Sequence, residues 1–171
     1  FLADANIHLA SARAGNVIGG GDWAFDRLLP DFLRALDAGK TLAIRSPNAI
    51  RPWQHVLGSL SGYLMLAEKL YTEGSAFAEA WNFGPNDDDA KTVGWVVDKL
   101  CALTTGGKWQ TESAQHLHEA SVLKLDSSKA REKLGWAPRW DLLTALNKTV
   151  EWHEAWSKKE DDDTSKYSNS N

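Results

Sequence analysis

Four polar segments of the chain combine arginine, asparagine and tryptophan side chains, which suit the binding of a diphosphate joined to flat or sugar rings. The segments are residues 16–23, 26–30, 51–55 and 81–84. Arginine offers paired N–H donors to phosphate oxygens, asparagine donates without adding charge, and tryptophan packs against rings. We expect each segment to end a strand or open a helix, because α/β sheets bind ligands at such places.

The first segment contains three consecutive glycines at residues 19–21. Without Cβ atoms, this turn can adopt positive φ angles and let a ligand approach the main chain. Arg13, Asn16 and Asp22 add a cation, an amide and a carboxylate around it. Trp23 adds a flat apolar wall. Taken alone, the motif is more typical of a turn that closes a buried strand, because it lacks the G-x-G-x-x-G spacing of a dinucleotide turn.

The hydrophobic pattern predicts short strands that alternate with helices. Apolar residues at helical spacing predict helices over residues 25–36, 56–70, 93–103, 127–134 and 141–156. Short apolar runs bounded by turn residues predict strands over residues 7–12, 41–45, 80–84, 108–111 and 122–125. This alternation predicts an α/β fold.

Two helices carry more detailed expectations. Asp26 is the expected N-cap of the first helix, with Phe25 on its apolar face. The second helix is expected to turn one apolar face inward, made of Val56, Leu60, Leu64, Ala67 and Leu70. Beyond residue 156 the chain is charged and has no aliphatic side chains, so residues 157–171 are expected to form a disordered polar tail.

Length and composition favour one ordinary globular domain. The 171 residues can bury one sizeable core, and the 43% apolar fraction is typical of a globular protein. A net charge of −4 argues against a nucleic-acid or anionic-membrane surface. The single Cys101 excludes an internal disulfide and fits a reducing cytosol, so we expect a cytoplasmic protein.

Taken in order, the motifs resemble the second half of the NAD-dependent nucleotide-sugar epimerases and dehydratases, a group of the extended short-chain dehydrogenases. The pattern R-x-x-N-x-x-G begins at Arg13, and Arg27 precedes L-x-P. R-P-W stands at residues 51–53, N-x-G at 82–84, and a segment of the type D-x-S-K…L-G-W-x-P at 126–138. The resemblance implies the end of a Rossmann-like sheet with a small α/β substrate-binding domain over residues 1–156, without the N-terminal NAD-binding part.

The resemblance also implies roles for the matching residues. The pyrophosphate and ribose would be bound by Asn16, Arg27, Arg51 and Asn82. The nucleobase and sugar pocket would be lined by Trp23, Leu28, Pro30, Ile44 and Arg45, with Asp22 and Trp53 from the same segments. His118 falls close to the sequence position at which the relatives have a phosphate-binding arginine. Ala14 and Gly15 would lie near the nicotinamide.

In this family NAD takes a hydride from the sugar and later returns it, and a Tyr-x-x-x-Lys pair carries part of the chemistry. No such pair occurs in this chain, so we expect no catalytic residue and no activity from the chain alone. Residues 19–23 and 51–55 are similar to those members that dehydrate CDP-glucose. The resemblance therefore implies the CDP-glucose-binding part of a hydro-lyase, cut just downstream of that pair, and a homo-oligomer for the full-length protein.

Two alternatives remain open on the sequence. The substrate could be a UDP- or dTDP-sugar, or the chain could be a free-standing nucleotide-sugar-binding module. His116, His118 and Glu119 lack a fourth ligand at suitable spacing, so no metal site is expected. Arg13 is expected to pair with a carboxylate, and Trp95 and Trp136 are expected to fill core.

Overall fold

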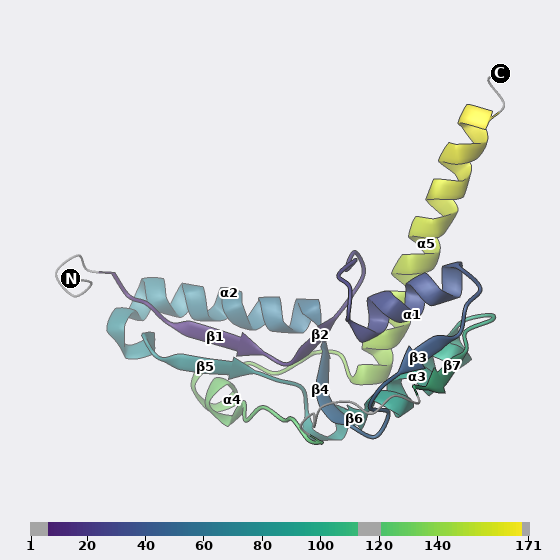
Figure 1. The fold of residues 1–171 in the computed structure, drawn as a ribbon. Helices are drawn as coiled ribbons and strands as arrows, with labels where there is room; N and C mark the ends of the chain where they lie inside the picture. Colours follow the sequence, from purple (N-terminus) through teal and green to yellow (C-terminus); the bar gives the residue numbers. More distant parts are fainter. Residues whose placement is uncertain (1–6, 113–120, 169–171) are drawn as a thin grey trace.

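The computed structural model describes residues 7–112 and 121–168 and contains short strands alternating with helices, as expected for an α/β protein (Figure 1). In chain order the elements are β1 (Ser11–Ala14), β2 (Asn16–Ile18), α1 (Leu28–Asp37), β3 (Leu42–Ile44), β4 (Ile50–His55), α2 (Val56–Glu73), the 3₁₀ helix η1 (Gly74–Phe77), β5 (Ala80–Phe83), the 3₁₀ helix η2 (Asp87–Asp89), β6 (Ala90–Thr92), α3 (Val93–Leu103), β7 (Trp109–Thr111), α4 (Ser128–Leu134) and α5 (Leu142–Ser168).

The described strands form three small sheets. β1 pairs in parallel with β5, and β3 pairs in parallel with β7. β4 lies between β2 and β6, parallel to the first and antiparallel to the second. Parallel pairing of strands separated by helices is the connectivity of α/β folds, so the predicted fold class is confirmed.

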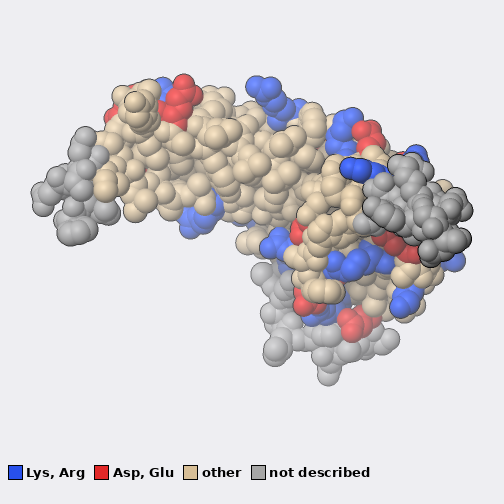
Figure 2. Space-filling model, turned by 90° about the horizontal axis from the view of Figure 1, so that it is seen from above, with Lys and Arg blue, Asp and Glu red and all other residues tan. Residues whose placement is uncertain are grey.

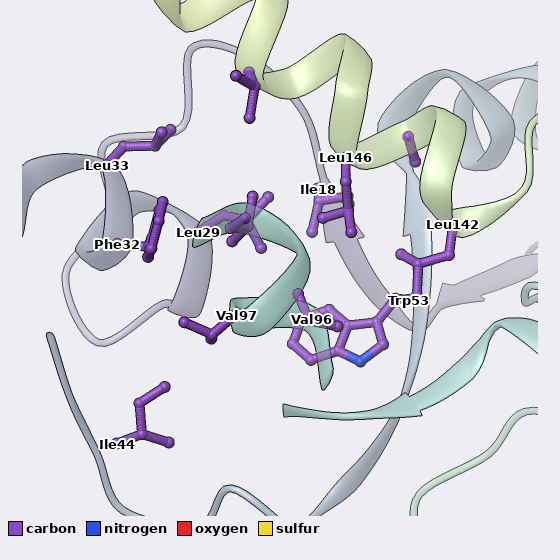
Figure 3. Packing of buried hydrophobic residues seen from close by; sticks show 13 residues of the cluster. Ile18, Leu29, Phe32, Leu33, Ile44, Trp53, Val96, Val97, Leu142 and Leu146 are labelled. Atoms are coloured by element: carbon purple, nitrogen blue, oxygen red, sulfur yellow. The ribbon is translucent and has the colours of Figure 1, made fainter. Parts of the chain in front are cut away.

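The larger core lies where α1, α3 and α5 meet β2 and β4 (Figure 3). Each helix turns one apolar stripe inward, as amphipathic helices do. The buried side chains are Ile18, Leu29, Phe32, Leu33, Ile44, Trp53, Val96, Val97, Leu100, Leu142, Ala145, Leu146 and Val150. This core fixes the N-terminal turn of α1 against the strands β2 and β4.

A smaller core joins α2, β5 and α4. Its buried members are Leu66, Phe77, Trp81, Phe83, Ala130, Leu134 and Trp136. α2 approaches β5 so closely that a Cβ on Gly62 would lie 2.2 Å from the Phe83 ring. The expectation that Trp136 fills core is confirmed, because its side chain is 2% exposed.

The inward face of α2 differs from the prediction. Ser59, Gly62 and Leu66 are buried, whereas Leu60 and Leu64 are exposed. Leu57 and Tyr71 extend the exposed apolar stripe along the helix. Figure 2 shows that few charged side chains interrupt the surface over α2. Because both faces of α2 carry apolar side chains, periodicity could not indicate which one is buried here.

Several strand bounds also differ from the prediction. The first strand lies over Ser11–Ala14 rather than residues 7–12. β2 and β4 form from segments that were expected to be loops, and β6 was not predicted. The strand expected over residues 122–125 is reduced to a single bridge between Val122 and Ile50.

The first helix begins one residue after Arg27, which is the N-cap in place of Asp26. Asp26 has a φ of 59°, a left-handed conformation that aspartate tolerates better than most residues. Phe25, expected on the apolar face, is instead 80% exposed and lies under the guanidinium of Arg34.

Helix α5 continues to Ser168, beyond the end expected near residue 156 (Figure 1). No glycine or proline occurs between Leu142 and Ser168, so nothing in the sequence breaks the helix. The predicted division into a part over residues 1–156 and a tail over 157–171 stays a prediction. Within the described part of the chain, no helix is long and apolar enough to cross a bilayer.

Candidate functional site

A cavity of about 230 Å³ lies between β2, the first turn of α1 and the loop that joins them. Its lining residues are Gly15, Asn16, Val17, Ile18, Gly19, Asp22, Asp26, Arg27, Leu28, Leu29, Pro30 and Trp53. Seven of the twelve were expected in the site from the sequence: Gly15, Asn16, Asp22, Arg27, Leu28, Pro30 and Trp53.

The floor of this cavity comes from the pairing of β2 with β4. Asn16 lies opposite Trp53 in the parallel register, so the amide and the indole reach the same site from two strands. The Trp53 indole is 3% exposed, and its Nε1 donates to the Lys91 carbonyl at 3.0 Å. Gly15 is required for this approach, because a Cβ there would lie 2.5 Å from the Pro52 carbonyl oxygen.

The opposite wall is the N-terminus of α1. The first turn of a helix presents unpaired N–H groups and the positive end of the helix dipole, which favour an anion. Arg27, the N-cap, makes no side-chain capping bond and lines the cavity, so a guanidinium adds to this positive end. Pro30 is tolerated in the first turn because its missing N–H needs no partner there.

Two carboxylates give the cavity a mixed electrostatic character. Asp22 and Asp26 both line it, and Asp22 Oδ1 accepts a hydrogen bond from the Ala24 amide at 3.0 Å. Asp26 also forms an ion pair with Arg45 at 3.4 Å. Carboxylate oxygens accept hydrogen bonds from hydroxyl groups, so the cavity joins an anion-binding end with acceptors for hydroxyls.

The expected arginine and asparagine on the neighbouring strands lie outside this cavity lining. Arg51, 8% exposed on β4, donates from Nη1 to the Ile50 carbonyl. Asn82 on β5 accepts from Arg13 Nε at 3.2 Å and donates to the Asp126 carbonyl at 3.0 Å. The expectation that Arg13 pairs with a carboxylate is therefore corrected: Arg13 donates to the side-chain amide of Asn82, because β1 and β5 place the two residues opposite each other.

Outside this cavity lining lie four further expected residues, Ile44, Trp23, Arg45 and Ala14. Ile44 is 5% exposed in the larger core rather than in the cavity. Trp23 packs against tryptophans of α5. Ala14 ends β1 beside Gly15 without lining the cavity. His118, and with it His116 and Glu119, lies outside the described residues.

Sequence reasoning missed several lining residues, of which Asp26 matters most for charge. The sequence did carry a signal for Asp26. It lies beside Arg27 in the segment 26–30 that was already selected, and aspartate accepts the left-handed conformation found here. The others are Val17, Ile18, Gly19 and Leu29.

A second cavity of about 380 Å³ lies at the N-terminus of α2. His55 Nδ1 accepts from the Leu57 amide and so caps the helix. Burial lowers the pKa of the His55 imidazole, whose ring meets Trp140 edge-on at 4.8 Å. Among the described residues there is no cluster of three metal-ligating side chains.

Comparison with known proteins gives one curated relative at high identity. The chain is 56% identical over 156 residues to CDP-glucose 4,6-dehydratase from Salmonella typhimurium, covering 91% of this chain and 44% of the relative. The chain therefore spans less than half the length of that protein. No family model matches the chain.

Solved structures of nucleotide-sugar enzymes share the fold. UDP-glucose 4-epimerase from Stenotrophomonas maltophila, with bound NAD and formylated UDP-arabinopyranose, aligns with a TM-score of 0.75 at 18% identity, over 92% of this chain and 52% of that one. dTDP-glucose 4,6-dehydratase from Bacillus anthracis, in complex with NAD, aligns with a TM-score of 0.67 at 22% identity, over 85% and 44%.

The resemblance drawn from the motifs is thus confirmed: the chain is similar in sequence to the C-terminal part of a CDP-glucose 4,6-dehydratase, and its fold is a C-terminal portion of the extended short-chain dehydrogenase fold.

Proposed function

We propose that this chain is the nucleotide-sugar-binding part of an NAD-dependent 4,6-dehydratase, a hydro-lyase that acts on CDP-glucose. The observation that carries the proposal is the 56% identity to the Salmonella enzyme across 91% of the chain. The cavity at the N-terminus of α1 supports it, because the cavity joins a positive end to hydroxyl acceptors.

In this proposal the two ends of the cavity have separate tasks. Arg27 and the first N–H groups of α1 bind the diphosphate, since a guanidinium and a helix N-terminus both favour phosphate oxygens. Asn16 adds an uncharged donor from β2. Asp22 and Asp26 repel phosphate and so face sugar or ribose hydroxyls instead.

The cofactor of the whole protein would be NAD, which supplies a hydride acceptor when bound. This chain contributes little to holding it: Ala14 and Gly15 stand at the carboxyl end of β1, the edge of a parallel sheet where α/β proteins bind ligands. Its own glycine turn lacks dinucleotide spacing. The chain alone is therefore expected to bind the nucleotide sugar but to release no 4-keto-6-deoxy product.

Calorimetric titration of the purified chain with CDP-glucose tests this proposal. Arg27→Ala is expected to raise Kd about tenfold or more, because a hydrogen bond between charged groups contributes about 1.5–3 kcal/mol. Arg139→Ala is the matched control, since Arg139 lines the second cavity and should leave Kd unchanged. Equal effects of the two variants would contradict binding at α1.

The same titration with UDP-glucose and dTDP-glucose separates the related enzymes. If UDP-glucose or dTDP-glucose binds more tightly than CDP-glucose, the result would favour an epimerase or dehydratase whose substrate carries another nucleobase. Steady product release from the chain with CDP-glucose and NAD would contradict the proposed dependence on an absent catalytic part. Binding by the chain at the affinity of a complete enzyme would favour a free-standing module.

A further inference from the structure

The glycine-rich turn that leads into the cavity is packed against two tryptophans of α5. A Cβ on Gly20 would lie 2.1 Å from Cδ2 of the Trp152 indole, a distance that no side chain can adopt. A Cβ on Gly21, whose φ is 77°, would lie 3.7 Å from the same ring, an ordinary van der Waals distance. Gly20 therefore makes room for an indole of this chain, and the positive φ of Gly21 favours glycine there.

Trp23 continues the contact on the other side of the turn. Its ring centroid lies 4.6 Å from that of Trp156 and 6.2 Å from that of Trp152. The two indoles of α5 are themselves stacked, with an interplanar angle of 4°. Aromatic pairs at such distances contribute stabilisation beyond that expected from their buried area alone. Contacts among these three indoles therefore hold the turn to α5.

Helix α1 holds the same segment from its other end. Arg34 donates from Nη1 to the Trp23 carbonyl and from Nη2 to the Ala24 carbonyl, both at 3.1 Å. His153, next to Trp152 on α5, contacts Asp37 of α1 at 2.8 Å. The loop over residues 19–27 is thus fixed between α5 and α1.

This loop supplies four cavity-lining residues, namely Gly19, Asp22, Asp26 and Arg27. Gly19, Asp22 and Asp26 lie in no helix or strand, whereas Arg27 is the N-cap of α1. The position of their polar groups therefore depends on what holds the loop. α5 itself is anchored in the larger core through Leu142, Leu146 and Val150.

We propose that Trp152 is a positioning residue of the nucleotide-sugar site and that it acts through the loop over residues 19–27, with Trp156 and Trp23 completing the clamp. The inference rests on the proposed function for the identity of the ligand. Trp152 acts by fixing the backbone that carries Asp22 and leads to Arg27, because it packs on Gly20 and its ring lies near that of Trp23.

Two measurements on Trp152→Ala test the clamp without any ligand. Hydrogen exchange of the amides of residues 20–25 is expected to rise at least tenfold, while exchange in α3 stays unchanged. The circular-dichroism couplet of the stacked indoles is expected to disappear. Trp152→Phe, which keeps a ring against Gly20, should restore slow exchange. Unchanged loop exchange in Trp152→Ala would overturn the proposal.

The link to the site is tested by titration with CDP-glucose. Trp152→Ala should raise Kd five- to tenfold, and Trp152→Phe should recover most of the affinity. Leu143→Ala, a similarly exposed side chain on the same helix, should change neither Kd nor loop exchange. Faster loop exchange with unchanged Kd would overturn the positioning role. If the unaltered chain binds no nucleotide sugar, the proposed function is wrong, whereas the exchange measurement still decides whether the clamp exists.

Discussion

The molecule has two regions that bury their apolar surface to different degrees. In the first, α1, α3 and α5 enclose β2 and β4 around thirteen buried side chains, and the candidate cavity opens from this core. In the second, α2 and α4 flank the parallel pair β1 and β5 around seven. The first region covers its apolar faces with its own helices.

The second region leaves apolar surface exposed that proteins normally bury. Parallel strands occur almost only in sheets with both faces buried, and a two-stranded sheet is marginally stable by itself. A helix that is apolar on opposite faces, as α2 is, is typical of a buried position. The candidate site therefore adjoins the region whose apolar side chains are buried by its own helices, as far as the described residues show.

The largest expected effect comes from emptying the larger core. Leu146→Ala removes a fully buried side chain and should lower the free energy of unfolding by about 3 kcal/mol, since the surrounding helices collapse only partly. Leu64→Ala on the exposed face of α2 should change it by less than about 0.5 kcal/mol. Chemical denaturation measures both. Comparable losses would mean that α2 is already covered in solution.

Two glycines of α2 provide a matched pair for the smaller core. Gly62→Ala should cost about 1–3 kcal/mol, because its Cβ would overlap the Phe83 ring. Gly58→Ala should stabilise by up to about 1 kcal/mol, because its Cβ meets only the Gln54 side chain at 3.9 Å and alanine favours the helix. Equal effects would contradict the close contact of α2 with β5.

The exposed stripe of α2 should bind a hydrophobic dye. Replacing Leu57, Leu60 and Leu64 together by serine should reduce the fluorescence of an added naphthalene-sulfonate dye at least twofold, because these side chains form one continuous apolar surface. The unfolding free energy should fall far less than in Leu146→Ala. Undiminished dye binding would place the accessible apolar surface elsewhere.

The smallest expected effects are opposite pH dependences of one carboxyl in each region. Burial raises the pKa of Asp89, which accepts a hydrogen bond from the Leu142 amide and so caps α5. Between its ordinary value of 3.8 and the raised pKa the folded state binds more protons, so stability falls as pH rises. Asp89→Asn keeps a hydrogen-bond acceptor but carries no titrating proton, so it does not lose stability in this way. Its free energy of unfolding, relative to that of the unaltered chain, should therefore rise with pH in that window.

Glu79 should behave in the reverse way. Its hydrogen bond and ion pair with Lys129 lower the pKa of the Glu79 carboxyl, so its contribution is present above 4.5 and is lost as pH falls through the lowered value. The difference between Glu79→Gln and the unaltered chain should therefore shrink on acidification. Thermal unfolding across this pH range checks both signs.

The helices of the larger core could be predicted because each has one apolar face. α2 could be predicted as a helix but not oriented, since both of its faces are apolar. β4 was missed because its residues 51–55 are polar or aromatic, and Pro52 lacks the N–H of a usual strand residue. The strand forms because β2 and β6 pair with it on both sides.

The structure brings part of the predicted site together, and the roles of its residues stay predictions. Asn16, Arg27 and Trp53 lie around one cavity, as the ordered motifs indicated. Trp23 was expected to line it because it follows the glycine turn, yet its partners stand on α5, more than a hundred residues later in the chain. A contact of that kind leaves no local pattern, and only the folded structure reveals it.

The length of α5 offers a practical use for this connection. The helix is continuous from the clamp at Trp156 to Ser168, which at 1.5 Å per residue is an arm of about 18 Å. Because the arm and the indoles belong to one helix, a reporter group at its far end would rotate with them. Such a reporter would lie on the helix that holds the loop, without altering any residue of the cavity.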